Sequence, residues 1–420
     1  MAATRRIAVG VAVAAVCASS LGGCASGPEA PRQGAPGAPQ KGPQLPGSLV
    51  RLIGDGSTAY TGAQPHLPRP ERLKAGEKPP QFVVFSWDGA GEDGQRLFSH
   101  FREVAKANNA TMTFFLSGVH LLPREKRDLY RPPRHAAGSS DIGFNDARGI
   151  ADTVEQVRLA WLEGHEIGTH LNGHFCGPDG GAGKWSVEEW KSEIAQAKQF
   201  VKTWRTNAGL NNAASLPFDY DKELIGGRTP CLEGRNNFVK AGSELGFRYD
   251  SSGVNNQVWP GKRDGLWDLS MQLVPFPGHT SEQLTTDYRF MGDQSGTRTQ
   301  GDPAQFDSWG EQMRDGLLKG FHRAYDGNRA PLVIGNHFES WNGGTYMRAV
   351  EDVVKEVCNK PAVRCVSFRQ LADWLDAQSP GTLAELRTLR VGEAPKQGWA
   401  SFLPARPAPA PKGAPGAPGA

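Results

Sequence analysis

Residues 164–176 read GHEIGTHLNGHFC, a short apolar run followed by two histidines four residues apart. On a helical turn, residues four apart lie on one face, so His170 and His174 are placed to share one divalent ion as neutral imidazoles. Taken alone, such a pair is more often two hydrogen-bonded histidines. The stretch is not the His-Glu-x-x-His motif of zinc proteases, because His170 comes one residue too late after Glu166 and Gly168 weakens a helix.

A carboxylate at the end of a predicted strand is the best candidate for a third ligand. Residues 81–89 read QFVVFSWDG, a buried strand that ends at Asp88. Two histidines and one carboxylate leave open positions on a metal for water and substrate, as in catalytic rather than structural sites. These donors suit Zn²⁺ best, and cobalt, nickel or iron are its competitors.

The composition predicts one large folded region with long flanks. Of 420 residues, 52 are Gly and 31 are Pro, and these concentrate at both ends. We expect a Pro/Gly-rich linker at 24–80, of which 49–72 has enough apolar residues to pack on the domain. A C-terminal extension at 379–420 ends in a disordered Pro/Ala/Gly-rich tail. The formal net charge of +3 and the lack of a basic run predict no nucleic-acid partner.

The N-terminus has the pattern of a lipoprotein signal peptide. Arg5 and Arg6 precede an apolar run at 7–18 that is too short to span a membrane. The sequence LGGC, ending at Cys24, resembles a bacterial lipobox, which implies removal of residues 1–23 and lipidation of Cys24. The alternative is an ordinary signal peptide without a lipid. We therefore expect an exported protein, lipid-anchored on the extracytoplasmic face of a bacterial cell membrane.

The cysteines beyond the targeting segment predict disulfides. Export implies an oxidising compartment, so the four cysteines of the mature domain predict two bridges. Three pairings are possible, and we favour Cys176–Cys231 and Cys358–Cys365. The alternative, that Cys176 is a metal ligand, is less consistent with a complete set of His and Asp donors.

Strand-like and helical segments alternate over 81–378, which predicts an α/β fold, a distorted (β/α) barrel. The expected strands cover 82–87, 111–116, 166–169, 224–228, 247–250, 272–275, 332–336 and 364–367. The expected helices cover 95–107, 152–163, 186–206, 236–245, 304–325, 345–358 and 367–377. Capping boxes predict the starts of two of them at Ser186 and Ser367. Polar residues stand at the ends of the expected strands, where a barrel has its active face. These residues are Asp88, His170, Arg228, Asp250 and His337.

Several of these segments match the motifs of one family. GHEIGTH at 164–170, with His174, matches a His-x-x-x-His metal motif. RTPC at 228–231 matches an Arg-x-Pro-Tyr motif with Cys in place of Tyr, and IGNHF at 334–338 matches a strand that carries a catalytic His. Over 81–378 the chain thus resembles the polysaccharide deacetylase family, the NodB-homology enzymes of carbohydrate esterase family 4, and most closely its chitin-deacetylase-like branch.

One motif departs from the family pattern. The family sequence Thr-Phe-Asp-Asp-Gly supplies a general base with its first Asp and a metal ligand with its second. Aligned on the glycine, this chain reads FSWDG at 85–89. The alignment keeps the metal ligand as Asp88 but places Trp87 at the position of the base, and an indole cannot accept a proton. Glu92 or Asp93, on the following loop, is the candidate replacement.

The resemblance implies a metal-assisted hydrolysis. A divalent metal, most simply Zn²⁺, polarises the acyl oxygen and lowers the pKa of a bound water. Its implied ligands are Asp88, His170 and His174. The implied general acid is His337, which protonates the departing amine or alkoxide.

The remaining implied roles belong to groups around this centre. Arg228 orients the carboxylate of the base, and its partner is Glu92 or, failing that, Asp250 or Asp268. A backbone N–H near Cys231 stabilises the oxyanion that forms when water attacks the acyl group.

The implied function is removal of N-acetyl or O-acetyl groups from a polysaccharide of the cell wall or the extracellular space. Trp341 offers an aromatic face on which a sugar can stack. Because Trp87 stands at the position of the base, the alternative is a degenerate, non-catalytic lipoprotein that binds glycan without cleaving it.

Overall fold

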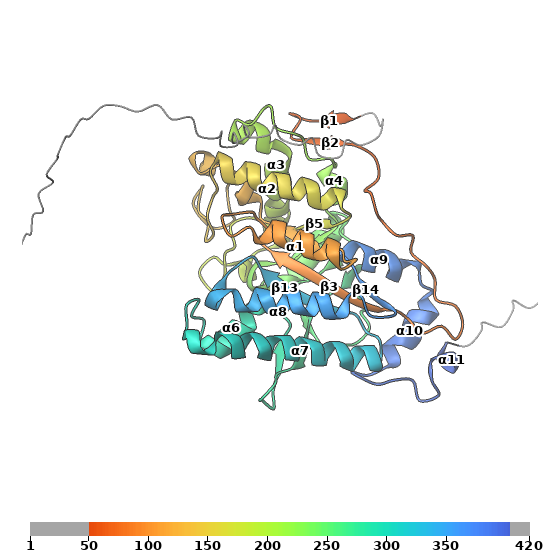
Figure 1. The fold of residues 1–420 in the computed structure, drawn as a ribbon. Helices are drawn as coiled ribbons and strands as arrows, with labels where there is room; N and C mark the ends of the chain where they lie inside the picture. Colours follow the sequence, from red (N-terminus) through yellow and green to blue (C-terminus); the bar gives the residue numbers. More distant parts are fainter. Residues whose placement is uncertain (1–49, 404–420) are drawn as a thin grey trace, which may run out of the picture. The chain divides into compact units, whose positions relative to one another are not determined.

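The computed structural model describes residues 50–403, and helices surround its largest sheet (Figure 1). Nine strands form this sheet. The order is β13 (Leu332–His337), β3 (Gln81–Asp88), β4 (Thr113–Leu116), β5 (Glu166–Thr169), β6 (Gly226–Gly227), β7 (Tyr249–Asp250), β10 (Leu266–Asp268) and β9 (Lys262–Arg263), with β14 (Val363–Cys365) also paired to β3. All pairs are parallel except β10–β9, which confirms the predicted distorted (β/α) barrel.

A second sheet lies beside β13, which is at one end of the strand order of the large sheet. It has three strands in the order β12 (Glu282–Leu284), β11 (Met271–Pro275) and β8 (Val254–Asn255). The N–H of Gly335 on β13 donates to the carbonyl of Thr285 at 2.9 Å, just after β12. This contact brings the segment after β12 to the carboxyl end of β13.

Helices wrap the sheet, and Figure 1 shows α7 and α8 running along one side of β3 and β13. The helices are α1 (Leu97–Ala107), α2 (Ala147–Leu162), α3 (Val187–Ala208), α4 (Tyr220–Glu223), α5 (Arg235–Glu244), α6 (Asp287–Ser295), α7 (Phe306–Asp326), α8 (Trp341–Val357), α9 (Phe368–Ala377), α10 (Pro380–Thr388) and α11 (Trp399–Phe402). The predicted capping boxes at Ser186 and Ser367 begin α3 and α9. No helix of the described residues is long and apolar enough to cross a bilayer.

The pleat of β3 separates two hydrophobic layers. Val83, Phe85 and Trp87 pack outward into the cluster formed with the helices. Phe82 and Val84 belong to the other cluster, inside the barrel. Successive side chains of a strand point to opposite faces, so Ser86 and Asp88 also face the interior.

The flanks differ in part from the sequence prediction. Strands β1 (Arg51–Ile53) and β2 (Thr58–Tyr60) form a hairpin within the predicted linker 24–80, and the indole of Trp204 on α3 donates to the carbonyl of Ser57 at 2.8 Å. The predicted extension 379–420 contains α10, whose Leu386 is buried. At both places buried apolar side chains, such as Ala59 and Leu386, stabilise regular structure despite the local Pro and Gly content. Residues 1–49 and 404–420, including the predicted signal peptide 1–23 and the lipidation site Cys24, lie outside the described residues.

Two disulfides join Cys176 to Cys231 and Cys358 to Cys365, which are the pairings that we favoured. The first connects the loop after β5 to the loop after β6, across 55 residues of sequence. The second closes a loop of only 7 residues between α8 and β14.

The two disulfides should contribute unequally to stability. Closing a loop in the unfolded chain removes entropy that grows with loop length, so we expect Cys176→Ser/Cys231→Ser to cost about 4 kcal/mol and Cys358→Ser/Cys365→Ser about 2–3 kcal/mol. Urea unfolding of the two double variants and the wild type measures this. A larger loss from the short-loop pair would contradict the expectation.

Candidate active site

A pocket of about 760 Å³ opens at the carboxyl ends of the barrel strands. It brings together most of the site residues predicted from the sequence. Those that line it are Asp88, Glu92, His170, His174, Cys231, His337 and Trp341. Arg228 is fully buried and hydrogen-bonds to Asp88. This is the face where a parallel barrel places its functional side chains.

Arg228 and Asp88 form an ion pair at the end of β3. Nη1 of Arg228 donates to Oδ1 of Asp88 at 2.8 Å, while Nη2 donates to Oγ of Ser86 at 3.0 Å and to Oγ of Ser251 at 2.8 Å. Burial alone would raise the pKa of the Asp88 carboxyl, but the positive charge of Arg228 holds that pKa below its usual value. Asp88 is therefore ionised at neutral pH.

Other predicted partners of Arg228 are engaged elsewhere. Asp250 and Asp268 both pair with Arg235, at 2.6 Å each. Glu92 accepts the backbone N–H of Ser99 at 3.0 Å and so caps the first turn of α1. The prediction that Arg228 pairs with Glu92, Asp250 or Asp268 is wrong, because the pleat of β3 brings Asp88 to the guanidinium first.

His337 ends β13 and is paired with a buried carboxylate that sequence reasoning missed. Its ring Nδ1 donates to Oδ1 of Asp287 at 2.8 Å, and its backbone N–H donates to Oδ2 at 2.7 Å. Although burial lowers the pKa of His337, the charge of Asp287 outweighs it and raises that pKa to about 9. His337 is thus a cation at neutral pH.

The loop after β5 presents His170 and His174 to the pocket without a helical turn. Leu171 and His174 have φ values of 64° and 58°, in the left-handed region. The hydroxyl of Tyr130 accepts the backbone N–H of Gly173 at 3.0 Å, and the side chain of Asn172 donates to the carbonyl of Glu193 at 2.9 Å. The two imidazoles still lie together, with ring centroids 5.1 Å apart, but the helical face that we predicted is wrong.

The two histidines have the protonation state of metal ligands. Burial lowers the pKa of His170 to about 3, and it lowers the pKa of His174 as well, so both rings are neutral. Nδ1–H of His170 donates to the carbonyl of Arg228 at 2.9 Å, which leaves the lone pair of Nε2 free. Metal-bound histidines are commonly oriented by such a hydrogen bond.

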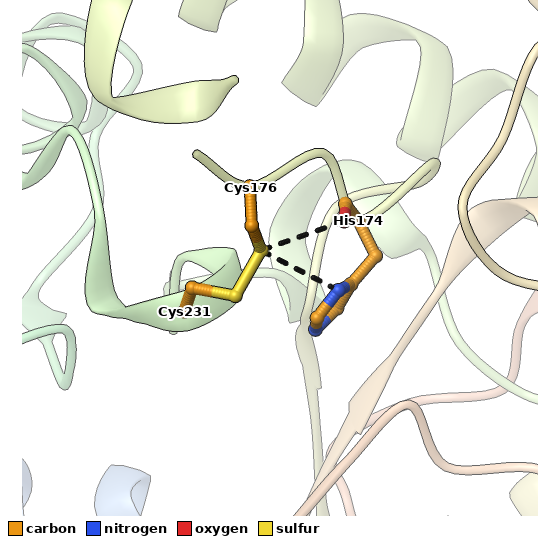
Figure 2. A group of neighbouring side chains, drawn as sticks. All are labelled: His174, Cys176 and Cys231. Atoms are coloured by element: carbon orange, nitrogen blue, oxygen red, sulfur yellow. Dashed lines mark hydrogen bonds between the residues drawn. A yellow bond between two sulfur atoms is a disulfide. The ribbon is translucent and has the colours of Figure 1, made fainter. Parts of the chain in front are cut away.

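The described residues nevertheless do not supply the three donors that the family implies for a metal. Asp88, His170 and His174 do not form a group whose ligand atoms all lie within 4.8 Å of one another. Within residues 50–403, the one group that meets this distance is His174, Cys176 and Cys231 (Figure 2). Its two sulfurs are joined in a disulfide, so neither is the thiolate that binds a metal. Three protein ligands are usual for catalytic zinc, and Asp88, His170 and His174 do not form such a group at this distance.

Trp87, at the position that the glycine alignment gave to the base, faces away from the pocket. Its indole is fully buried and stacks on Phe338 with ring centroids 4.6 Å apart, and Phe101 lies at 4.2 Å. Position 87 therefore belongs to the outer hydrophobic layer and has no access to the pocket.

The pocket wall also contains polar groups that sequence reasoning did not single out. Ser117 Oγ and His120 Nδ1 are buried atoms without a hydrogen-bond partner in the described part of the chain. Tyr288 lies on the rim, with its ring centroid 5.9 Å from that of Trp341. Asp287 directly precedes Tyr288 at the start of α6, a helix that we did not predict, so no sequence pattern marked either residue.

Comparisons with known proteins found similar solved structures at low sequence identity. No protein-family model matches the chain, and no curated protein matches it. A candidate polysaccharide deacetylase from Mycobacterium smegmatis has 17% identity and a TM-score of 0.46, with 73% of this chain and 94% of that chain covered. A pseudoenzyme of the CE4 family from Bacillus anthracis has 10% identity and a TM-score of 0.38, covering 73% and 70%.

A third similar structure is the family 4 acetyl xylan esterase from Clostridium thermocellum, solved with a cobalt ion. It has 13% identity and a TM-score of 0.37, with 69% of this chain and 89% of that chain covered. The solved structures similar to this chain thus include both an acetyl xylan esterase and a pseudoenzyme of the CE4 family.

The charge on His337 should depend on Asp287. In Asp287→Asn the carboxylate that stabilises the imidazolium is gone, so we expect the pKa of His337 to fall from about 9 towards or below its ordinary 6.5. NMR titration of the histidine rings in both proteins measures the change. A His337 pKa that stays near 9 in the variant would show that Asp287 does not hold the proton.

Placing a carboxylate at position 87 should damage the fold rather than supply a base. Removing a buried indole costs about 3–5 kcal/mol, and burying a charge adds to that. We expect Trp87→Asp to lose at least this much unfolding free energy in urea. Trp341→Asp, a matched change at the first turn of α8 and the pocket wall, should lose much less. Equal losses would contradict the outward placement of Trp87.

Proposed function

We propose that this chain hydrolyses acetyl groups carried by an extracellular or cell-surface polysaccharide. One observation supports this most: the pocket holds an ionised carboxylate, Asp88, and a protonated imidazole, His337, on the ends of the adjacent strands β3 and β13. Pairs of titratable groups whose environments separate their pKa values are typical of acid–base catalysis. The motif resemblance supports an acetylated glycan as the substrate.

The two groups divide the proton transfers between them. Asp88 accepts a proton from the water that attacks the acetyl carbon, and His337 donates its proton to the nitrogen or oxygen that leaves. The products are acetate and a free amine or hydroxyl. Arg228 keeps Asp88 oriented and ionised, while Asp287 keeps His337 charged. Both proton transfers use side chains of this chain, and the described donors fall short of a three-ligand metal site.

The rim of the pocket provides a place for a sugar. Tyr288 and Trp341 present aromatic rings at an interplanar angle of 65°, and the ring of His337 lies 5.4 Å from that of Trp341. A sugar ring packs its apolar face on such side chains. A sugar bound on Trp341 is therefore close to the general acid. Cys231, the predicted oxyanion position, is exposed on the pocket wall.

A second candidate function is glycan binding without hydrolysis. The incomplete set of metal donors favours it, because a CE4-like site that lacks a ligand loses the Lewis acid that polarises the acyl oxygen. This candidate keeps the aromatic rim and the export signals, and it differs from the first only in turnover.

We also propose that the protein is an exported lipoprotein anchored through Cys24. The LGGC sequence supports lipidation, and the two disulfides of the domain are consistent with an oxidising compartment. The anchor would hold the pocket near the cell surface, where acetylated polysaccharide occurs.

The test is a deacetylation assay of the full-length chain on acetylated chito-oligosaccharides and on a small acetyl ester. Loss of a general acid or base costs roughly 10²–10⁴ in rate, so we expect His337→Ala and Asp88→Asn each to lower kcat by this factor. Trp341→Ala should raise KM for the oligosaccharide and leave KM for the small ester unchanged.

The outcomes separate the two candidates. Oligosaccharide binding without turnover on either substrate would favour the glycan-binding protein. Neither binding nor turnover would contradict both. Turnover that survives His337→Ala and Asp88→Asn would contradict the assignment of the acid and the base.

A further inference from the structure

We infer that this chain has lost the carboxylate ligand of the expected metal centre, that the vacant position is Gly89, and that Asp88 is the proton-accepting carboxylate beside Arg228. The inference concerns the same pocket as the proposed function. Its test measures metal binding, so the two can fail separately.

The pleat of β3 shows which residue faces the guanidinium. Ser86 and Asp88 are two residues apart and both accept hydrogen bonds from Arg228, while Trp87 between them is buried on the opposite face. Aligned by this alternation, the aromatic of the Thr-Phe-Asp-Asp-Gly motif corresponds to Trp87. Its first Asp then corresponds to Asp88 and its second to Gly89.

Asp88 is already hydrogen-bonded to Arg228. One carboxylate oxygen accepts the guanidinium hydrogen bond at 2.8 Å, and the carboxylate does not complete a compact three-donor group with His170 and His174. A carboxylate that pairs with a buried arginine is held in place and ionised, which suits a proton acceptor.

Position 89 has room for a side chain and faces the hydroxyl of Ser117, which lacks a partner among the described residues. Gly89 lines the pocket, and a Cβ built there meets nothing closer than Ser117 Oγ and His120 Cε1, both at 3.8 Å. Ser117 Oγ is buried without a partner among the described residues, whereas His120 turns Cε1 towards position 89 and its Nδ1 lies 3.5 Å from a Cβ built at position 91. An unsatisfied buried hydroxyl is costly, so a polar side chain at position 89 would give Ser117 a partner.

The conformation of Gly89 is compatible with an aspartate. Its φ is +64°, in the left-handed region, where Asp and Asn are tolerated better than other side chains. His170 keeps its Nδ1 hydrogen bond to the carbonyl of Arg228, so this ring remains oriented for a metal. Because Gly89, His170 and His174 line the same pocket, we expect a carboxylate at position 89 to join the two histidines on a metal.

The experiment titrates Zn²⁺ alone into the full-length chain by calorimetry. We expect weak binding by the wild type and at least about tenfold tighter binding by Gly89→Asp, which corresponds to 1.4 kcal/mol. The gain should vanish in Gly89→Asp/His170→Ala. Gly91→Asp adds the same charge to the same pocket wall and is the matched control, with no comparable gain expected.

Circular dichroism checks that each variant is folded. Should Gly89→Asp fail to fold, Gly89→Asn offers an oxygen donor of the same shape, with a smaller gain expected. Wild-type affinity equal to that of a folded Gly89→Asp, or an equal gain in Gly91→Asp, would overturn the inference. Tighter zinc binding without deacetylation would uphold it and count against the proposed function instead.

Discussion

The ion pair between Arg228 and Asp88 organises the carboxyl end of the barrel. Arg228 is fully buried, and a buried charge is tolerated only when it is paired and hydrogen-bonded. Its guanidinium bonds to Asp88 and Ser86 at the end of β3 and to Ser251 after β7, so one side chain ties distant parts of the sheet together. Gly335 on β13 makes space for it, since a Cβ there would lie 2.9 Å from Nη1.

The same pair sets the electrostatics of the pocket. Arg228 keeps Asp88 anionic, and Asp287 keeps His337 cationic. These charges persist although all four side chains are largely withdrawn from water. His170 and His174 are buried, and no carboxylate of the described residues is hydrogen-bonded to either ring. Burial therefore keeps both rings neutral. One pocket thus holds an anion, a cation and two neutral imidazoles, each fixed by its surroundings rather than by its residue type.

The sequence predicted the elements well where periodicity was strong. The capping boxes at Ser186 and Ser367, the apolar strand at 332–336 and the disulfides all appear in the structure. The hairpin at 51–60 was obscured by the Pro/Gly-rich composition around it. Asp287 could not be assigned, because its role depends on a tertiary contact with His337 and not on any local pattern.

The role of Asp88 was only partly predictable from the sequence. Alignment on a glycine placed Trp87 at the site and made Asp88 a ligand, whereas the period of two along β3 puts Ser86 and Asp88 on one face and Trp87 on the other. The alternation was readable from the sequence, but which face pointed inward became clear only from the packing of Phe82 and Val84 inside the barrel.

The most direct test is a crystal structure of the protein soaked with Zn²⁺. Our account predicts that any ion in the pocket is bound by His170 and His174 with solvent completing its shell, while Asp88 stays on Arg228. An Asp88 oxygen at about 2.0–2.2 Å from the ion, the usual zinc–carboxylate distance, would contradict it.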